Sequence, residues 1–313
     1  MPLVIGTDEA GYGPNLGPLV VAASAWKCSK LDELTVDSLS DESAAAISLE
    51  IADSKQLYQS GQGLGRLERN LLAAARITGH SFALWREAWQ ALAGHSGEAL
   101  QELAPWHRDF NPPLPCAATD EEIGSLADPA QRMLAGKRRL LRALAARAVF
   151  PGEFNAELRV RGNKAHVLSV VTLALAREML EKFPDRPAVV ICDKHGGRDR
   201  YMALLQHTFP DELIRIVCEG SEESRYRFGP PRREIEFVFR PRSERWLPAA
   251  LASMTAKYLR ELAMQAFNNF WCREVPGLAP TAGYPTDARR FRLAIAERQV
   301  ALGISDEVLW RER

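Results

Sequence analysis

The sequence lacks three features that would narrow the class of protein at once: an excess of charge of one sign, paired cysteines and a long apolar run. Its 313 residues carry 40 Lys plus Arg against 40 Asp plus Glu, so affinity for a nucleic acid has to come from a local patch. The five cysteines are scattered, and none forms a Cys-x-x-Cys pair, which argues against structural zinc and favours a reducing compartment. With no apolar run of membrane-spanning length and no signal segment, we expect a soluble cytoplasmic monomer that does not contact the membrane. Nothing in the sequence identifies a protein partner.

The length suits one large α/β domain with an insertion and an appendage. The pattern changes after about residue 91, where a proline-rich stretch precedes a basic amphipathic segment over 128–149 that we interpret as a helix. The expected parts are a first half of the main domain over 1–90, a partly helical insertion over 91–155, a second half over 156–268 and a C-terminal helical appendage over 269–313.

Within the main domain, short apolar runs alternate with segments of helical spacing. The expected strands cover 3–5, 19–25, 188–192, 213–218 and 234–240, and the expected helices cover 64–77, 163–182 and 247–267, with a turn and a final short helix after 281. Asn163 is the expected N-cap of its helix. This alternation predicts a sheet flanked by helices.

Acidic residues stand at two expected strand ends. Asp193 follows the apolar run over 188–192, and Asp8 with Glu9 follows the first strand, which is where α/β sheets place their chemistry. The glycines from Gly6 to Gly17 also allow a phosphate-loop interpretation, but two prolines and two carboxylates oppose it unless a cation lies between. Carboxylate oxygens suit Mg²⁺, so a metal site is favoured over a solvated acidic turn.

Five segments, in order, resemble motifs of type 2 ribonuclease H (ribonuclease HII), of the ribonuclease H-like superfamily. They are Gly6-Thr7-Asp8-Glu9-Ala10-Gly11-Tyr12-Gly13-Pro14, Asp53-Ser54-Lys55-Gln56-Leu57, Asp193 after its helix and strand, Leu251-Ala252-Ser253-Met254-Thr255-Ala256-Lys257, and Gly283-Tyr284-Pro285-Thr286. The resemblance implies a mixed five-stranded sheet flanked by helices. It also implies four carboxylates that bind Mg²⁺ or Mn²⁺ and a substrate of RNA/DNA hybrid or DNA containing ribonucleotides.

Two departures from the family pattern bear on function. Tyr12 replaces the arginine of a Gly-Arg-Gly motif that helps recognise the ribonucleotide junction, and Ser243 stands where the fourth acid is expected. The neighbouring Glu244 is the preferred fourth acid, because a joint between a strand and a helix can absorb a one-residue shift. Its alternatives are an ion pair of Glu244 with Arg240 or Arg245, or replacement by Glu219, Glu222 or Glu223.

Further residues are candidates for contact with the substrate. By resemblance they are Gly11, Tyr12, Gly13, Lys55, Lys257 and Tyr284, and His195 joins them as a proton shuttle or substrate contact unless it merely starts the next helix. Basic and aromatic residues interleave between Arg225 and Trp246, a mixture that suits phosphate contacts with base stacking or, alternatively, a half-buried hairpin. The basic cluster over 137–142 is interpreted as a solvated face.

The expected activity is metal-dependent hydrolysis of the RNA strand of RNA/DNA hybrids, or of DNA at embedded ribonucleotides, with Asp8, Glu9, Asp193 and Glu244 as catalytic metal ligands. Two alternatives stay open. One is a non-catalytic nucleic-acid-binding protein on the same fold, and the other is a nuclease specific for a DNA structure.

Overall fold

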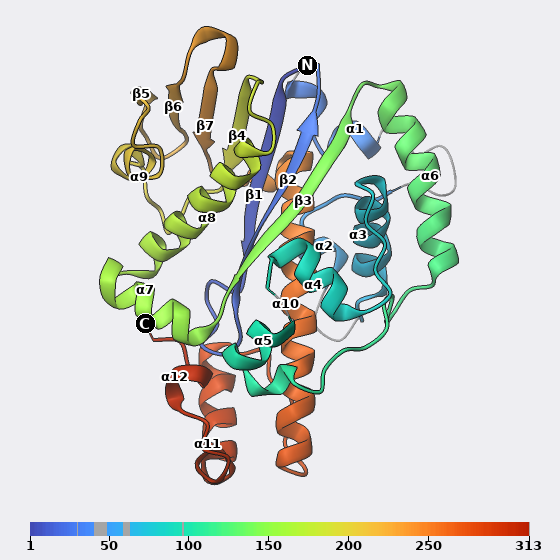
Figure 1. Ribbon diagram of the computed structural model, residues 1–313, viewed down its shortest axis with the longest axis vertical. Coiled ribbons are helices and arrows are strands. Elements are labelled where there is room, and N and C mark those ends of the chain that lie inside the picture. The colour runs from blue at the N-terminus through green and yellow to red at the C-terminus, as the bar shows by residue number, and fades with distance from the viewer. Residues whose placement is uncertain (30, 41–48, 59–62, 96, 313) are drawn as a thin grey trace.

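A computed structural model describes residues 1–29, 31–40, 49–58, 63–95 and 97–312. One seven-stranded sheet runs through the molecule in the order β3-β2-β1-β4-β7-β6-β5 (Figure 1). The strands are β1 (Leu3–Ala10), β2 (Leu19–Lys27), β3 (Leu140–Val149), β4 (Ala188–Cys192), β5 (Arg215–Cys218), β6 (Ser224–Phe228) and β7 (Ile235–Phe239). The mixed α/β architecture is confirmed, but the expected count of five strands is wrong.

Strand direction divides the sheet into two parts. β1 runs parallel to β4, and β4 runs parallel to β7, whereas β2 and β3 continue the sheet on the other side of β1 in antiparallel pairs. The two strands that the sequence analysis did not expect are β3 and β6, and β6 pairs with β5 and β7 in antiparallel directions at the far edge. The carboxyl ends of β1, β4 and β7 therefore meet at one edge of the sheet.

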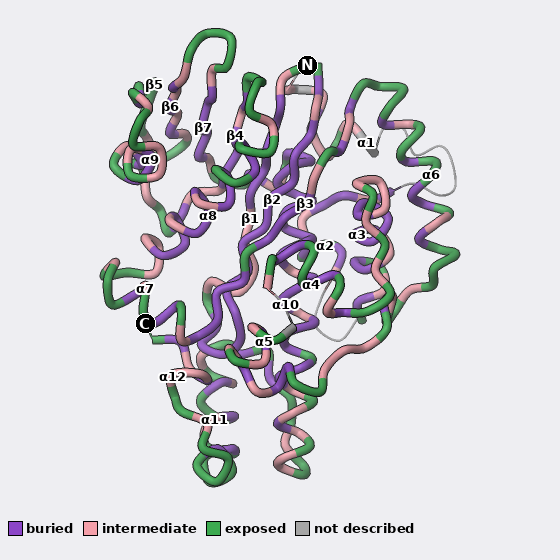
Figure 2. Tube along the Cα trace, viewed as in Figure 1, coloured by how far each residue is buried: buried purple, intermediate pink, exposed green. Residues whose placement is uncertain are grey.

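Helices cover both faces of the sheet and enclose two apolar cores. The α-helices are α1 (Asp37–Ser40), α2 (Ser54–Leu57), α3 (Gly65–Ile77), α4 (Trp85–Ala93), α5 (Gly97–Leu103), α6 (Asp120–Gly136), α7 (Pro151–Arg161), α8 (Lys164–Glu181), α9 (Met202–Thr208), α10 (Leu247–Glu274), α11 (Pro285–Ala301) and α12 (Asp306–Leu309). Short 3-10 helices are η1 (Leu31–Glu33), η2 (Pro105–His107), η3 (Pro231–Arg233) and η4 (Ser243–Arg245). One core joins the sheet to α3, α4, α6 and α10, and the other joins it to α7, α8 and α9 (Figures 1 and 2).

The two helices that flank the central strands begin and end for local reasons. The Asn163 side chain accepts a hydrogen bond from the His166 N–H and caps α8, as the sequence predicts. α10 begins after Trp246 with Pro248 in its first turn, where the missing N–H costs nothing. None of the helices in the described ranges is long and apolar enough to cross a membrane.

The interpretation of residues 128–149 as one basic helix is wrong. The helix α6 ends at Gly136, a turn with Arg138 at φ +57° follows, and the chain then enters β3. Alanine, leucine and arginine favour a helix, but pairing of β3 with β2 along nine positions overrides that local preference. The expected insertion over 91–155 thus contains a strand of the main sheet.

The helices of the C-terminal part are longer than expected. α10 continues to Glu274, beyond the expected boundary at 268, and α11 is a 17-residue helix rather than a short one. Phe267 packs against Phe291 with ring centroids 5.3 Å apart. The chain then returns to the connection between β1 and β2, where Trp310 forms an isolated antiparallel bridge with Leu16.

Gly6 allows α10 to lie directly on β1, which gives a testable prediction about stability. A Cβ atom at this position would stand 2.1 Å from the Ala249 nitrogen and 2.2 Å from the Pro248 carbonyl carbon. Gly6→Ala is therefore expected to lower the free energy of unfolding by roughly 3 kcal/mol or more, measured by urea denaturation. Gly136→Ala is the control, because its Cβ meets nothing within 4 Å; equal stability of the two variants would contradict this account.

Candidate metal and nucleic-acid site

The register of the parallel strands brings Asp8 and Asp193 side by side. Gly6 pairs with Ile191 at the last position of the β1–β4 ladder, and two further residues along each strand lead to Asp8 and Asp193. The pairing of β1 with β2 continues to Ala10, so the first strand is longer than the expected 3–5. Both acids thus lie in extended chain, at the edge where the parallel strands end.

Asp8 and Glu9 point to opposite faces of β1, because side chains alternate along a strand. Asp8 faces α10 and accepts a hydrogen bond from the Ser253 hydroxyl. Glu9 shares its face with Leu3 and Ile5, which belong to the core under α8. Asp193 stands just beyond the tip of β4, and its charge acts on both acids. The three carboxylates therefore lie near one another, but those of Asp8 and Glu9 leave opposite sides of β1.

The surroundings of these acids disfavour their ionised forms. Burial, followed by the charge of Glu9, raises the pKa of Asp8 well above its usual range. Burial and the charge of Asp193 raise the pKa of Glu9 to about 7. Burial also raises the pKa of Asp193, helped by the charge of Glu244. Carboxylates that raise one another's pKa mark a place where a cation would be bound favourably.

One lysine opposes this concentration of negative charge. The charge of Lys55 lowers the pKa of both Glu9 and Asp193, so the ammonium group lies at the same edge. Asp53 accepts a hydrogen bond from the Lys55 N–H (3.2 Å) and caps α2, and the Ser54 hydroxyl lies 3.1 Å from that of Ser253 on α10. The motif around Lys55 is thus attached to the helix that supports Asp8.

Glu244, the expected fourth acid, lies near Asp193. Glu244 lies in η4, after the carboxyl end of β7, and its charge raises the pKa of Asp193. Ser243 beside it is fully buried. Two of the three alternative acids have other partners: Glu219 accepts a hydrogen bond from the Tyr226 hydroxyl (2.6 Å), and Glu223 pairs with Arg225 (2.9 Å) and lies 3.9 Å from Arg240.

The loop from Gly11 to Gly13 lies next to these acids. The charge of Glu9 contributes to the raised pKa of Tyr12, and the Tyr12 hydroxyl would stand 3.2 Å from a Cβ atom at Gly196. Gly13 is exposed, and the ring of Tyr284 would stand 3.9 Å from a Cβ at that residue. Tyr284 is 57% exposed, so its ring is available for contact with a ligand.

Two candidate residues have other surroundings. The Lys257 ammonium pairs with Glu261 (2.6 Å) and lies 4.7 Å from the centroid of the Tyr58 ring. His195 is 2% exposed, its Nδ1 lies 3.0 Å from the Ser169 hydroxyl, and burial lowers its pKa to about 3. A neutral, enclosed imidazole is poorly placed to carry protons at neutral pH, so its surroundings favour a structural role for His195.

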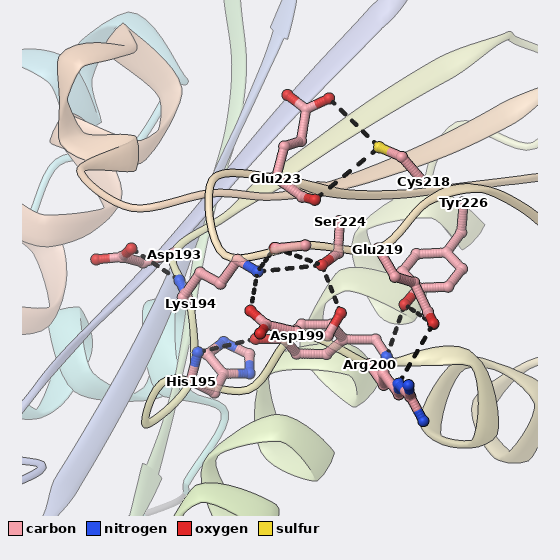
Figure 3. Close-up of polar contacts among 12 residues, drawn as sticks. Asp193, Lys194, His195, Asp199, Arg200, Cys218, Glu219, Glu223, Ser224 and Tyr226 are labelled. Atoms are coloured by element: carbon pink, nitrogen blue, oxygen red, sulfur yellow. Dashed lines mark hydrogen bonds and ion pairs between the residues drawn. The ribbon is translucent and has the colours of Figure 1, made fainter.

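A polar network holds the segment that follows Asp193 (Figure 3). The Lys194 N–H donates to the Asp193 carboxylate (2.7 Å), and the Lys194 ammonium donates to Asp199 (2.7 Å) and to Ser224 (3.1 Å). The Lys194 side chain is only 7% exposed. This network joins Asp193 to β6, one of the strands that the sequence analysis did not expect.

The interpretation of the stretch from Arg225 to Trp246 as a stacking surface is wrong for its aromatic residues. Tyr226, Phe228, Phe237 and Phe239 are at most 1% exposed and belong to the core under α8. On the opposite face, Arg225 pairs with Glu236 (2.5 Å). Alternation along β6 and β7 separates the aromatic face from the charged face, which is the half-buried hairpin of the alternative interpretation.

The donors at the edge suit a hard divalent cation, because oxygen ligands and concentrated negative charge favour Mg²⁺ or Mn²⁺. In the described ranges, no three His, Cys, Asp or Glu side chains already stand together as a metal-binding group. Asp8 and Glu9 leave opposite faces of β1, and their carboxylates and that of Asp193 are near enough for their charges to interact.

Sequence reasoning missed several residues that shape this site. Ser253 was quoted only as part of a motif, and its hydrogen bond to Asp8 depends on how α10 crosses β1. The role of Lys194 near the site could have been inferred from the sequence, because this residue directly follows Asp193. Arg260 and Arg311 had none, because their contacts with the Gly11–Leu16 loop span 244 and 300 residues.

Comparison with known proteins finds similarity among solved structures. No family model and no curated protein matches the chain. The chain is similar over 99% of its length to RNase HII in its complex with PCNA from Archaeoglobus fulgidus, at 16% identity, 94% coverage of that chain and a TM-score of 0.48. The ribonuclease H2 from Pyrococcus horikoshii OT3 matches 98% of this chain and 92% of its own, at 15% identity and a TM-score of 0.45.

A third similar structure is Bst-RNase HIII in complex with Mn²⁺, at 15% identity and a TM-score of 0.44, with 99% of this chain covered. The match spans 65% of that longer chain, so this protein corresponds to slightly less than two thirds of it. Over nearly its whole length, the chain is structurally similar to ribonucleases HII and HIII.

Proposed function

We propose that this protein is a metal-dependent endonuclease that hydrolyses the RNA strand of RNA/DNA hybrids, or DNA at embedded ribonucleotides. The observation that carries the proposal is the position of Asp8, Glu9 and Asp193 at the carboxyl ends of the parallel strands β1 and β4, where burial and neighbouring acids raise the pKa of each. Acids in this arrangement hold their charge at a cost, and a bound cation removes that cost.

The residues have separate roles in this proposal. Asp8, Glu9, Asp193 and Glu244 hold Mg²⁺ or Mn²⁺, and Ser253 holds the Asp8 carboxylate in place by its hydrogen bond. The bound metal supplies activation of a water molecule and stabilisation of the departing oxygen. Lys55 stands beside the acids, where its ammonium contributes a phosphate contact.

The outer parts of the site contact the nucleic acid. Gly11, Tyr12 and Gly13 offer backbone close to the acids, and the exposed ring of Tyr284 faces Gly13. A tyrosine ring of this kind can stack on a ribose or a base. Lys257 is a more distant phosphate contact, which becomes available if its ion pair with Glu261 opens.

A substrate panel tests the proposal. RNA/DNA hybrid and duplex DNA with one embedded ribonucleotide are expected to be cut in Mg²⁺ or Mn²⁺, and plain duplex, single-stranded and branched DNA are not. Denaturing gels of labelled strands measure the cleavage, and a chelator is expected to abolish it because the acids alone cannot activate water. Binding of hybrid without cleavage would indicate a non-catalytic protein, and cleavage of branched DNA alone would indicate a nuclease specific for a DNA structure.

A further inference from the structure

Two buried arginines stand behind the loop that carries Gly11 and Tyr12. Arg311, in the C-terminal segment, is 1% exposed and donates through Nη2 to the carbonyl oxygens of Gly11 (2.6 Å) and Pro14. Arg260, on α10, is 3% exposed and donates through Nη2 to the carbonyl oxygen of Leu16 (3.3 Å). Both guanidinium groups therefore bind the loop through its carbonyls.

The burial of these two cations is costly. The contacts of the described residues include no ion pair between either arginine and a carboxylate, and Arg311 Nε and Nη1 and Arg260 Nε lack hydrogen-bond partners there. Burial lowers the pKa of both groups; at Arg260 the charge of Glu261 opposes this effect, whereas at Arg311 the charge of Arg260 adds to it. A buried arginine without a counter-charge destabilises the fold, so the contact of Arg311 with the loop needs a further reason.

The orientation of the Gly11 peptide supplies that reason. In a trans peptide the carbonyl and the following N–H point in opposite directions. Because the Gly11 carbonyl points inward at Arg311, the Tyr12 N–H points outward. Gly11 has φ +86°, and a Cβ there would stand 2.3 Å from Arg260 Nε, so only glycine fits between the loop and the arginines.

The other donors of the loop are already used. Asn15 and Leu16 donate their N–H groups to the Gly283 carbonyl (2.8 and 3.3 Å), and Pro14 has no N–H to donate. From Tyr12 to Leu16, the N–H groups without a backbone acceptor among the described residues are those of Tyr12 and Gly13. The charge of Glu9 acts on the Tyr12 side chain, and the ring of Tyr284 would stand 3.9 Å from a Cβ at Gly13.

We propose that Arg311 is a positioning residue, which holds the Gly11 carbonyl inward so that the Tyr12 N–H faces a backbone phosphate of the bound nucleic acid. The inference rests on the proposed function and assigns part of its phosphate binding to the C-terminal segment. Backbone N–H groups bind phosphate without a side-chain cation. The loop can therefore bind the substrate although Tyr12 itself carries no positive charge.

The attachment of the C-terminal segment fits this role. The backbone of Arg311 forms two hydrogen bonds with Asn15. The Arg311 N–H donates to the Asn15 backbone carbonyl (2.8 Å), and the Arg311 carbonyl accepts from the Asn15 side-chain amide (3.0 Å). Asn155 on α7 donates to the Trp310 carbonyl (2.8 Å). Farther out, Arg159 pairs with Glu307 (2.7 Å) and Glu312 (2.6 Å), which provides a matched site for a control.

Arg311→Met and Arg311→Lys test the proposal. The first removes the guanidinium, and the second keeps a charge on a shorter side chain but loses Nη2, the atom that donates to both carbonyls. Each is expected to raise KM for RNA/DNA hybrid about tenfold while kcat changes less than about twofold, because one phosphate hydrogen bond is lost equally from substrate and transition state. The shift in melting temperature caused by Mn²⁺ is expected to stay as in the wild type. Arg159→Met is expected to leave KM unchanged.

The outcomes separate this inference from the proposed function. Circular dichroism first establishes that each variant is folded; if Arg311→Met is not, Arg311→Lys decides, and unfolding of both would mean a purely structural role and overturn the proposal. Wild-type cleavage with unchanged KM in the folded variants overturns this inference alone. A wild-type protein that neither binds nor cuts hybrid overturns the proposed function and this inference together.

Discussion

Asp8→Asn and Asp193→Asn are each expected to lower cleavage of RNA/DNA hybrid by at least two to three orders of magnitude, on the order of what the loss of one electrostatic stabiliser costs an enzyme. The two acids come from neighbouring parallel strands, β1 and β4, and stand side by side at the carboxyl edge. An amide keeps the size of the side chain and removes the charge that attracts the metal. Single-turnover cleavage at saturating enzyme measures the chemical step separately from binding.

The same variants should remain folded. Asp8 is disfavoured in its ionised form by burial and by Glu9, so the neutral amide is expected to preserve or raise the stability of the metal-free protein. Asp185→Asn is the matched control, because Asp185 is exposed and precedes β4 at the opposite end from Asp193. An Asp193→Asn protein that cuts hybrid as fast as the wild type would show that Asp193 has no part in the reaction.

Glu9→Gln is expected to stabilise the metal-free protein at pH 8 and to have no effect near pH 4. The pKa of Glu9 is about 7 in the folded chain against a usual value of 4.5. Below pH 4.5 Glu9 is protonated in both the folded and the unfolded chain, so its ionisation does not change the free energy of unfolding. As the pH rises from 4.5 to 7, the unfolded chain ionises first, so the folded state loses stability relative to it, and the loss is complete above 7.

The size of this effect has an upper limit of roughly 3 kcal/mol, which corresponds to the difference between the two pKa values. Urea denaturation in a chelator, at several pH values between 4 and 8, measures it as the difference between wild type and Glu9→Gln. Comparing the two proteins is necessary because buried His107 and His195, with pKa values lowered to about 3, change the free energy of unfolding with pH in the opposite direction. Both proteins contain these histidines, so their contribution cancels in the difference. A difference that does not depend on pH would contradict the assigned environment of Glu9.

With metal present, the wild type is expected to become the more stable of the two proteins at pH 8. Mn²⁺ is expected to stabilise the wild type at pH 8 more than it stabilises Glu9→Gln, because the ion binds the folded state through the carboxylates. Thermal melts with and without the metal provide the measurement. Equal stabilisation of the two proteins would place Glu9 outside the metal site.

Local sequence was a good guide wherever an element depends on its own residues. The periodic apolar positions and the Asn163 cap predicted α8, and the continuous apolar run predicted β4. The same reasoning failed for β3, whose Ala, Leu and Arg residues favour a helix until β2 pairs with them. It also failed for the aromatic residues of β6 and β7, because their burial depends on the position of α8 and α9.

What the sequence by itself determined is the chemistry available: acids at the ends of apolar strands, glycines in the loop between them, and a lysine after a helix cap. Only the tertiary structure decided how these groups combine. It set Asp8 and Glu9 on opposite faces of β1 near Asp193, added β3 and β6, connected β6 to Asp193 through Lys194, and brought Arg311 to Gly11. The physical reason is that caps and periodicity act within a few residues, whereas strand register and electrostatic interaction depend on groups that are distant in the chain and near in space.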